Sequence, residues 1–397
     1  MKRRTFLQQS AYASTALMIP AFLKAYQPQH LQNSRSGKNL VIIQFSGGND
    51  GLNTVVPFRN DLYYQHRPTL AVADSEVIKI SDQLGLNPAL QPIQSLFDEG
   101  LISIINNVGY PNPDRSHFRS MDIWHTASES NEYLSTGWLG RYLDSSCLGC
   151  STPHQAIELD DGLSLALKGY DRKGFAMSNP TQLKRQTNNP LLKYMAQHPH
   201  EHQEENVAYL YKTLVDTYAS ADYLFEQSKM HPSKVSYPST PFGKDLQQIS
   251  ALIRADTDTR IYYVSLSGFD THVNQRVQQE RLLQQYAEGI KAFVADLQQH
   301  NLFKDTLVMT FSEFGRRVKQ NASKGTDHGT ANNVFLMGGD LKKPGFFNEG
   351  PDLTQLDQGD LVYKVDFRNI YATILDKWLQ TDSKAILNKQ FKPMTFI

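Results

Sequence analysis

Short apolar runs rich in β-branched residues alternate along this chain with segments in which apolar residues recur at helical spacing. The runs predict buried strands, and the helical spacing predicts amphipathic helices. Strands are expected over residues 40–45, 101–105, 260–268, 306–311 and 334–337. Helices are expected over residues 88–99, 204–227, 281–300 and 366–379, with another beginning near residue 116. Strands that alternate with helices predict one α/β domain built on a largely parallel sheet.

A polar stretch at about residues 170–250 interrupts this alternation. It contains the long helical pattern of residues 204–227, whose Tyr and Leu positions favour packing against a core. We interpret the stretch as a helical insertion that lies over one side of the sheet. The predicted organisation is therefore a domain over residues 39–397 with this insertion, preceded by a polar linker over residues 27–38.

The first 26 residues have the character of a targeting segment. Arg3 and Arg4 precede Thr5-Phe6-Leu7 and a modest apolar stretch over residues 11–23. This order is typical of a twin-arginine export signal, although a cytoplasmic helix that begins with basic residues is the alternative. The apolar stretch is too short and too interrupted for a stable membrane span. We therefore expect a protein exported to the periplasm, or otherwise exported by this pathway, with the twin-arginine translocase as its partner during export.

Charge excludes one class of partner. The chain has 40 Lys and Arg residues and 40 Asp and Glu residues. Four of the basic residues and none of the acidic ones lie in the first 26 positions, so the rest of the chain has 36 basic and 40 acidic residues. A mildly acidic protein offers no global field that attracts nucleic acid. No nucleic-acid partner is expected.

Two cysteines, Cys147 and Cys150, form the only CxxC motif of the sequence. Such a motif is a redox pair or one half of a zinc site. The chain has no further cysteine, so it cannot build a four-cysteine zinc site alone. For an exported protein we favour a local disulfide or two idle thiols.

Polar residues follow three of the predicted strands at the point where each strand ends. Asp50 follows the first strand in a glycine-rich turn, Asp270-Thr271-His272 follows another, and Glu313 ends the strand at residues 306–311. Ligands in open α/β sheets bind outside the carboxyl ends of the strands. With His328, which lies in a glycine-flanked loop, these side chains predict one metal site. Asp50 and Asp270 could equally be turn residues, because Asp is common in turns.

Carboxylates and imidazoles together bind divalent ions. We expect zinc first, with manganese, magnesium or calcium as alternatives. Such an ion polarises a phosphoryl or sulfuryl oxygen and lowers the pKa of a bound water or serine. Arg316 is predicted to orient an anionic group in two-point fashion, unless it only pairs with Glu313. Asp327, beside His328, is a secondary candidate.

The segment around Ser116 predicts a helix start, because the apolar residues at 118, 121 and 124 have helical spacing. Ser116 is either the N-cap of that helix or a nucleophilic hydroxyl, since a helix N-terminus stabilises negative charge. His117 and His125 are interpreted as hydrogen-bonding residues without a metal role. His117 is nevertheless kept as a secondary candidate for the site.

Six motifs resemble those of a bacterial family of undefined function that is exported by the twin-arginine pathway. They are GGNDGLNTVVP, DRSHFRSMDIWHT, STGWLGRYLD, SGFDTH, TFSEFGRR and GTDHGTANNVFLMGG. That family is grouped with the alkaline phosphatase and sulfatase-like superfamily, and the match covers essentially all of the chain after the signal. The resemblance implies a three-layer α/β/α sandwich with a metal site at the carboxyl end of its sheet.

The resemblance also implies roles for individual residues. Asp50 matches a first-strand ligand, Ser116 the nucleophile, and Asp270 with His272 an Asp/His ligand pair. Glu313 stands where the superfamily has an aspartate, and His328 matches a late histidine. Phe314 stands where the superfamily has a histidine, so one metal ion or a repurposed site is an alternative to a two-metal site.

These observations predict a metal-dependent hydrolase of a phosphate or sulfate ester, acting on a small anionic ester or a glycan-derived ligand. The alternative is a non-catalytic exported protein that binds such a ligand through a degenerate site.

Overall fold

The computed structural model describes residues 37–146, 154–197, 205–230 and 232–397. The predicted signal, nearly all of the predicted linker, and Cys147 with Cys150 lie outside these ranges. The predictions for them remain predictions.

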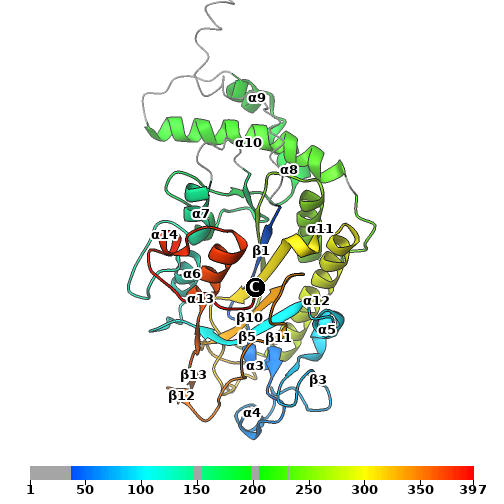
Figure 1. Cartoon of the computed structure of the whole chain (residues 1–397), viewed down its shortest axis with the longest axis vertical. Coiled ribbons are helices and arrows are strands. Elements are labelled where there is room, and N and C mark those ends of the chain that lie inside the picture. The colour runs from blue at the N-terminus through cyan, green and yellow to red at the C-terminus, as the bar shows by residue number, and fades with distance from the viewer. Residues whose placement is uncertain (1–36, 147–153, 198–204, 231) are drawn as a thin grey trace, which may run out of the picture. The chain divides into compact units, whose positions relative to one another are not determined.

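A mixed sheet of nine strands forms the centre of the described chain (Figure 1). Its order is β11-β5-β10-β9-β1-β8-β6-β7, and β14 pairs with β5. The strands are β1 (Asn39–Ser46), β5 (Ile102–Gly109), β6 (Ala156–Glu158), β7 (Phe175–Ala176), β8 (Ile261–Ser267), β9 (Thr306–Ser312), β10 (Asn332–Met337), β11 (Gly345–Phe346) and β14 (Val365–Asp366). β10 is antiparallel to both of its neighbours, and the other pairings are parallel. The predicted, mostly parallel sheet is confirmed.

Helices cover both faces of this sheet (Figure 1). The α-helices are α3 (Gly51–Thr54), α4 (Asp61–His66), α5 (Gln94–Asp98), α6 (His117–Thr126), α7 (Trp138–Ser146), α8 (Pro180–Thr187), α9 (Pro190–Gln197), α10 (Glu205–Met230), α11 (Pro241–Arg254), α12 (Gln275–Gln299), α13 (Phe367–Thr373) and α14 (Ser383–Leu387). Shorter helical turns are η1 (Pro88–Ile93), η2 (Leu165–Leu167), η3 (Phe303–Asp305) and the π-turn η4 (Ile374–Trp378). A small three-stranded sheet has the order β2 (Val55–Val56), β4 (Gly85–Leu86), β3 (Ile78–Lys79). A two-stranded sheet pairs β12 (Leu356–Asp357) with β13 (Asp360–Leu361).

The alternation of side chains along β1 explains the two covered faces. Val41 and Ile43 join a core that includes residues of α11 and α12, whereas Leu40 and Ile42 join a second core with residues of α6, α7, α13 and α14. Successive side chains of a strand point to opposite faces of the sheet, so an uninterrupted apolar strand needs a helix layer on each side. The predicted three-layer α/β/α architecture is confirmed.

Two expected helices differ in detail from the structure. Residues 88–99 form η1 and then α5, because Pro92 cannot donate the hydrogen bond that a continuous α-helix needs. α12 begins at Gln275, six residues before the expected start at Arg281. Gln275 and Gln279 of its first turns are buried in polar contacts, so a pattern of apolar residues cannot reveal them.

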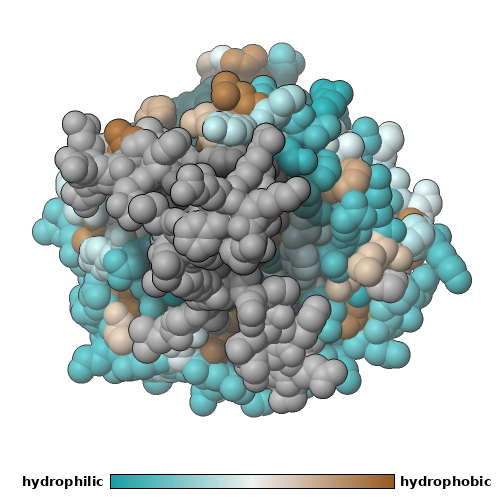
Figure 2. Space-filling model, turned by 90° about the horizontal axis from the view of Figure 1, so that it is seen from above, coloured by the Kyte–Doolittle hydropathy of each residue, from teal (hydrophilic) through white to brown (hydrophobic). Residues whose placement is uncertain are grey.

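The predicted insertion contains α8, α9 and α10, and α10 packs against α8, α9 and α11. These three helices lie above the strands in Figure 1. Figure 2 views the protein from that end and shows apolar residues among mostly polar ones on the visible surface. Leu191 and Tyr194 of α9 and Met230 of α10 are exposed. In contrast, α11 packs against α12 in a core layer, although the predicted insertion included it.

Within the described residues, no helix combines the length and the apolarity needed to span a membrane.

Candidate metal centre

The strands β8, β1 and β9 lie side by side in parallel and end together. Ser46 of β1 is paired with Ser267 of β8, and Phe45 is paired with Ser312 of β9. Their exit loops therefore leave the sheet at one edge, as the sequence predicted. Gly47 has a φ of +118°, and a Cβ atom there would lie 2.4 Å from the backbone nitrogen of Asp270. Only glycine allows the β1 and β8 exit loops to approach this closely.

Three imidazole rings converge on one carboxylate oxygen at this edge. Asp270 Oδ1 lies 3.5 Å from His117 Nε2, 3.2 Å from His328 Nε2 and 3.0 Å from His272 Nε2. His272 Nε2 is also 2.9 Å from His328 Nε2. Ligand atoms of His117, Asp270 and His328 all lie within 4.8 Å of one another. We call His117, Asp270, His272 and His328 the His–Asp cluster.

In two of the rings, the contact made by Nδ1 determines which ring nitrogen carries the proton. His117 Nδ1 lies 2.9 Å from Glu313 Oε1, and His328 Nδ1 lies 2.8 Å from the carbonyl oxygen of Arg115. These oxygens only accept hydrogen bonds, so each neutral ring carries its proton on Nδ1. The Nε2 lone pairs therefore face the centre of the cluster. Metal-binding histidines are oriented in this way by a carboxylate or a carbonyl behind them.

His272 repeats this arrangement more loosely, since its Nδ1 lies 3.5 Å from Asp327 Oδ1. Asp327 is thus placed behind a cluster residue, and its loop is held by Asn321, which donates to Asp327 Oδ1 and to the carbonyl of His272.

The spacing of the donor atoms fits a single metal ion. Four ligands around a tetrahedral zinc ion, each about 2.0–2.1 Å from it, lie about 3.4 Å apart. The Nε2–Oδ1 distances of 3.5 Å for His117 and 3.2 Å for His328 are close to that value. His117 Nε2 is buried and has no hydrogen-bond partner among the described residues. A bound cation would satisfy this orphaned nitrogen.

Charges in the cluster are tuned by its neighbours. Partial burial raises the pKa of Asp270, but its contacts with Arg316 and His328 outweigh this effect and lower that pKa to about 2. The hydrogen bond to Glu313 raises the pKa of His117, whereas burial lowers the pKa of His328. The side chain of Asp270 is 50% exposed, so the cluster is open to a ligand from solvent.

A family model described as "Protein of unknown function (DUF1501)" matches residues 95–394. The chain belongs to this family. All four residues of the His–Asp cluster lie within the matched segment of this DUF1501 protein, whereas Asp50 precedes it.

No curated protein matches the DUF1501 chain. Among solved structures, it is similar to the C-terminal periplasmic domain of EcEptC from Escherichia coli in complex with zinc (10% identity, 77% of this chain and 74% of that chain, TM-score 0.36). It is also similar to the lipoteichoic acid synthase LtaP from Listeria monocytogenes, with 10% identity, 78% of this chain and 67% of that chain covered, and a TM-score of 0.35. A third similar structure is a protein in the alkaline phosphatase superfamily from Vibrio parahaemolyticus, with 8% identity, 79% of this chain and 62% of that chain covered, and a TM-score of 0.36. At these identities and TM-scores the similarities carry no argument about function.

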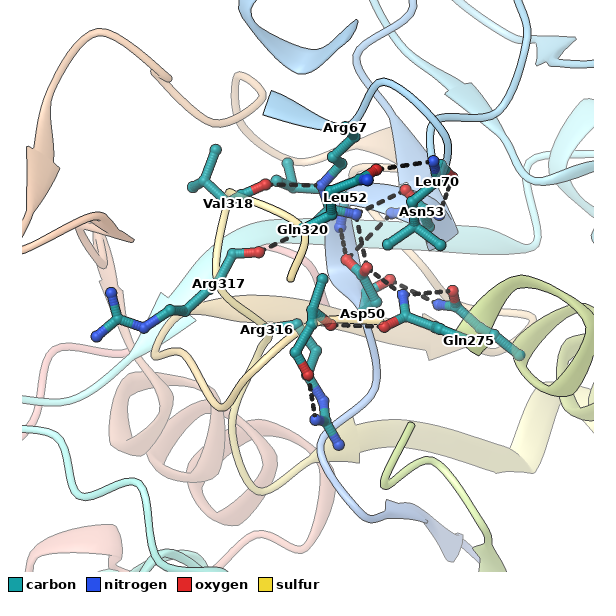
Figure 3. A network of polar contacts seen from close by, with 12 residues as sticks. Asp50, Leu52, Asn53, Arg67, Leu70, Gln275, Arg316, Arg317, Val318 and Gln320 are labelled. Carbon is teal, nitrogen blue, oxygen red and sulfur yellow. Dashed lines mark hydrogen bonds and ion pairs between the residues drawn. The ribbon is translucent and has the colours of Figure 1, made fainter. Parts of the chain in front are cut away.

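Asp50, predicted as a metal ligand, lies in a network of buried polar contacts within the protein. Its Oδ1 caps α3 by accepting from the backbone nitrogens of Leu52 and Asn53, and its Oδ2 lies 2.6 Å from Arg67 Nη1 (Figure 3). Gln275 donates to the same Oδ2. Both oxygens are occupied by protein donors, and the side chain is 1% exposed. The turn interpretation of Asp50 is the one that the structure supports.

Arg316 is likewise held in buried contacts with the protein. Its guanidinium is fully buried and donates to the carbonyl oxygens of Gly47, Gly48, Phe269 and Thr326. It also donates to Asp270 Oδ1 over 2.8 Å. Arg316 therefore ties the exit loops together and contacts Asp270, and its guanidinium is engaged by protein acceptors rather than exposed to an anion.

Glu313, predicted as a metal ligand, lies behind His117 and contacts its Nδ1. Its carboxylate is buried and accepts from the backbone nitrogen of Gly47 over 2.8 Å as well as facing His117 Nδ1. The ring of Phe314 is packed against His117 and His328, with ring centroids 4.8 and 4.7 Å apart. An aromatic ring thus lies beside the cluster, and the described residues contain no second group of ligands there.

Ser116 precedes α6 as its N-cap residue, yet its side chain makes no capping hydrogen bond. It is exposed and stands between Arg115, whose carbonyl contacts His328, and the cluster residue His117. Both interpretations of Ser116 therefore remain compatible with its position.

Sequence analysis kept His117 only as a secondary candidate and assigned it no metal role. The structure brings it to the cluster from the start of α6, 196 positions away from Glu313. Its position next to a candidate nucleophile at a helix start was the available signal. His125, in contrast, is buried and hydrogen-bonded to Gln44 and Tyr263, as expected.

Proposed function

We propose that this DUF1501 protein is an exported, metal-dependent hydrolase of a phosphate or sulfate ester. The observation that carries the proposal is the convergence of three Nε2 atoms on Asp270 Oδ1, with Nδ1 of His117 and His328 held from behind. An imidazole-rich donor set with one carboxylate favours zinc over magnesium or calcium, which prefer oxygen ligands. We therefore propose one zinc ion in the His–Asp cluster.

A zinc ion held by these residues would supply Lewis acidity, polarising the ester and lowering the pKa of a nearby hydroxyl or water. The protein would contribute the nucleophile and its setting. In this proposal the Ser116 hydroxyl gives up its proton to water and its oxygen attacks the phosphorus or sulfur atom of the ester. The bond from that atom to the alcohol oxygen breaks, and the alcohol leaves after taking up a proton. Water then hydrolyses the serine ester, which releases phosphate or sulfate and restores the hydroxyl. Ser116 is exposed at the start of the ten-residue helix α6, where the helix dipole stabilises negative charge.

Export is part of the proposal and rests on the N-terminal sequence. Arg3-Arg4 followed by Thr5-Phe6-Leu7 is typical of the signal that the twin-arginine translocase reads. We propose the periplasm as the location of the protein and a small anionic ester or glycan-derived ester as its ligand.

The first test is the metal content of full-length protein that is exported and purified without chelator. We expect about one zinc ion per chain by elemental mass spectrometry, because the described residues offer one cluster of ligands. Hydrolysis of phosphate and sulfate esters should stop after treatment with a chelator and return when zinc is added.

His272→Ala and His117→Ala should both lose this zinc, whereas His300→Ala should retain it. His300 is an exposed histidine near the end of α12 and lies outside the cluster. Metal-free wild-type protein, or equal zinc in all three variants, would contradict the proposal.

The role of Ser116 is tested by Ser116→Ala. If its hydroxyl is the nucleophile, turnover should fall by about 10³-fold or more, while zinc content stays that of wild type. Steady-state hydrolysis is the measurement, with Ser130→Ala as a control on a serine of the loop after α6. Full turnover in Ser116→Ala would remove the nucleophile from the proposal and leave the metal site intact.

Binding without turnover is the second candidate function. The buried position of Arg316 favours it, because the guanidinium predicted to hold the anion is not available to a ligand. A binding protein would show a melting shift with an anionic ester and no product, and this outcome separates the two functions.

A further inference from the structure

Gln275, the first residue of α12, connects two parts of the chain through one side chain. It is fully buried and follows the cluster residue His272 by three positions. Its Nε2 donates to Asp50 Oδ2, and its Oε1 accepts from the hydroxyl of Thr326, each over 2.5 Å (Figure 3 shows the contact with Asp50). Both polar ends of the amide are therefore satisfied by specific partners.

The Asp50 end of this connection is a fixed anchor. Asp50 forms a buried ion pair with Arg67, whose own side chain is 0% exposed. Arg67 also donates from Nε to the carbonyl of Val318 and from Nη2 to the carbonyl of Arg317, each over 2.9 Å (Figure 3). A buried charged pair with its remaining donors satisfied holds its geometry tightly. The anchor thus fixes both Gln275 and the segment that follows Arg316.

At the other end of this connection, Thr326 contacts the loops that carry the cluster residues. Thr326 is buried and lies two residues before His328. Its carbonyl accepts from Arg316 Nη1 over 2.9 Å, and its backbone nitrogen donates to the carbonyl of Thr271, between Asp270 and His272. The Gln275–Thr326 hydrogen bond therefore joins the loop that carries His272 to the loop that carries His328.

We infer that Gln275 and Thr326 are positioning residues for the His–Asp cluster, holding the loops of His272 and His328 at the spacing that binds a metal ion. This inference rests on the proposed metal site. Neither residue belongs to the cluster, so each acts through the backbone that carries His272 or His328. Groups behind metal ligands that fix their orientation typically change metal affinity by about 10–100-fold when they are removed.

Thr326→Val tests the inference because valine keeps the shape of threonine and removes only the hydroxyl that Gln275 Oε1 needs. We expect the zinc affinity of the full-length protein to fall about 10–100-fold, measured by competition with a chelator. The visible absorption spectrum of the cobalt-loaded protein should also change, because it reports the arrangement of the ligands. Thr326→Ser, which restores a hydroxyl, should recover both readouts.

Thr310→Val is the matched control. Thr310 is buried in β9, and its hydroxyl is 2.9 Å from the hydroxyl of Tyr286, so valine there also removes one buried hydrogen bond. Both valine variants should lower the midpoint of denaturation, but only Thr326→Val should change zinc affinity and the cobalt spectrum.

The outcomes separate this inference from the proposed function. Wild-type zinc affinity and cobalt spectrum in Thr326→Val would overturn the positioning role and leave the metal site standing. An equal loss of affinity in Thr310→Val would also overturn it, because the effect would then follow general stability. A wild-type protein that binds no zinc would overturn the proposed function and the positioning role together.

Discussion

Replacing Asp270 with asparagine is expected to weaken zinc binding by about a thousandfold, or about 4 kcal/mol. Asp270 Oδ1 is the atom at which the three imidazoles meet, and its pKa of about 2 keeps the carboxylate charged at neutral pH. Asparagine has nearly the same size and can still accept a hydrogen bond from Arg316 through its amide oxygen. The variant therefore removes the negative charge while changing the packing little.

Chelator competition on full-length protein is the measurement, and Asp327→Asn is its control. Asp327 is also a half-exposed carboxylate near the cluster, but it faces Nδ1 of His272 and not the centre. We expect about a tenfold loss or less in that variant. Similar affinities in the two variants would show that Asp270 is not a ligand.

Replacing Arg67 with methionine is expected to lower the free energy of unfolding by about 4 kcal/mol. Among the described residues, Arg67 is the one charged partner of Asp50, whose side chain is 1% exposed, and the change removes it. It also leaves the carbonyls of Arg317 and Val318 without the donors that Arg67 supplies. An uncompensated charge buried in a protein is costly, because water no longer solvates it.

Equilibrium denaturation by urea of the metal-free protein measures this loss without a contribution from zinc binding. Lys79→Met is the control, because Lys79 and Asp74 form an ion pair of 2.9 Å in which both side chains are about half exposed. That variant should change stability by no more than about 0.5 kcal/mol.

Adding Asp50→Asn to Arg67→Met should recover part of the stability, since the buried negative charge is then gone. If Arg67→Met is no more destabilising than Lys79→Met, the Asp50–Arg67 pair is not a major support of this loop region.

The sequence by itself determined the fold class and three of the four residues of the cluster. Apolar runs such as residues 40–45 and 306–311 predict buried strands because this pattern depends on neighbouring residues alone. The carboxyl ends of parallel strands meet at one edge of a sheet, so Asp270 and His272 could be assigned to a common site with His328. Motif resemblance added the three-layer architecture, which both packed faces of β1 confirm.

The tertiary structure alone decided which partner each charged residue finds. Asp50 and Asp270 both follow strands in turns, yet one meets Arg67 in the interior and the other meets three imidazoles at the surface. From the sequence, Arg316 is a cation in a polar loop. In the structure it is buried and donates hydrogen bonds to four carbonyl oxygens. A residue's chemical type is local, but its solvation and its partners depend on segments that folding brings together. The sequence could therefore locate the candidate metal centre, while only the fold distinguishes the cluster residues from those that contact them from behind.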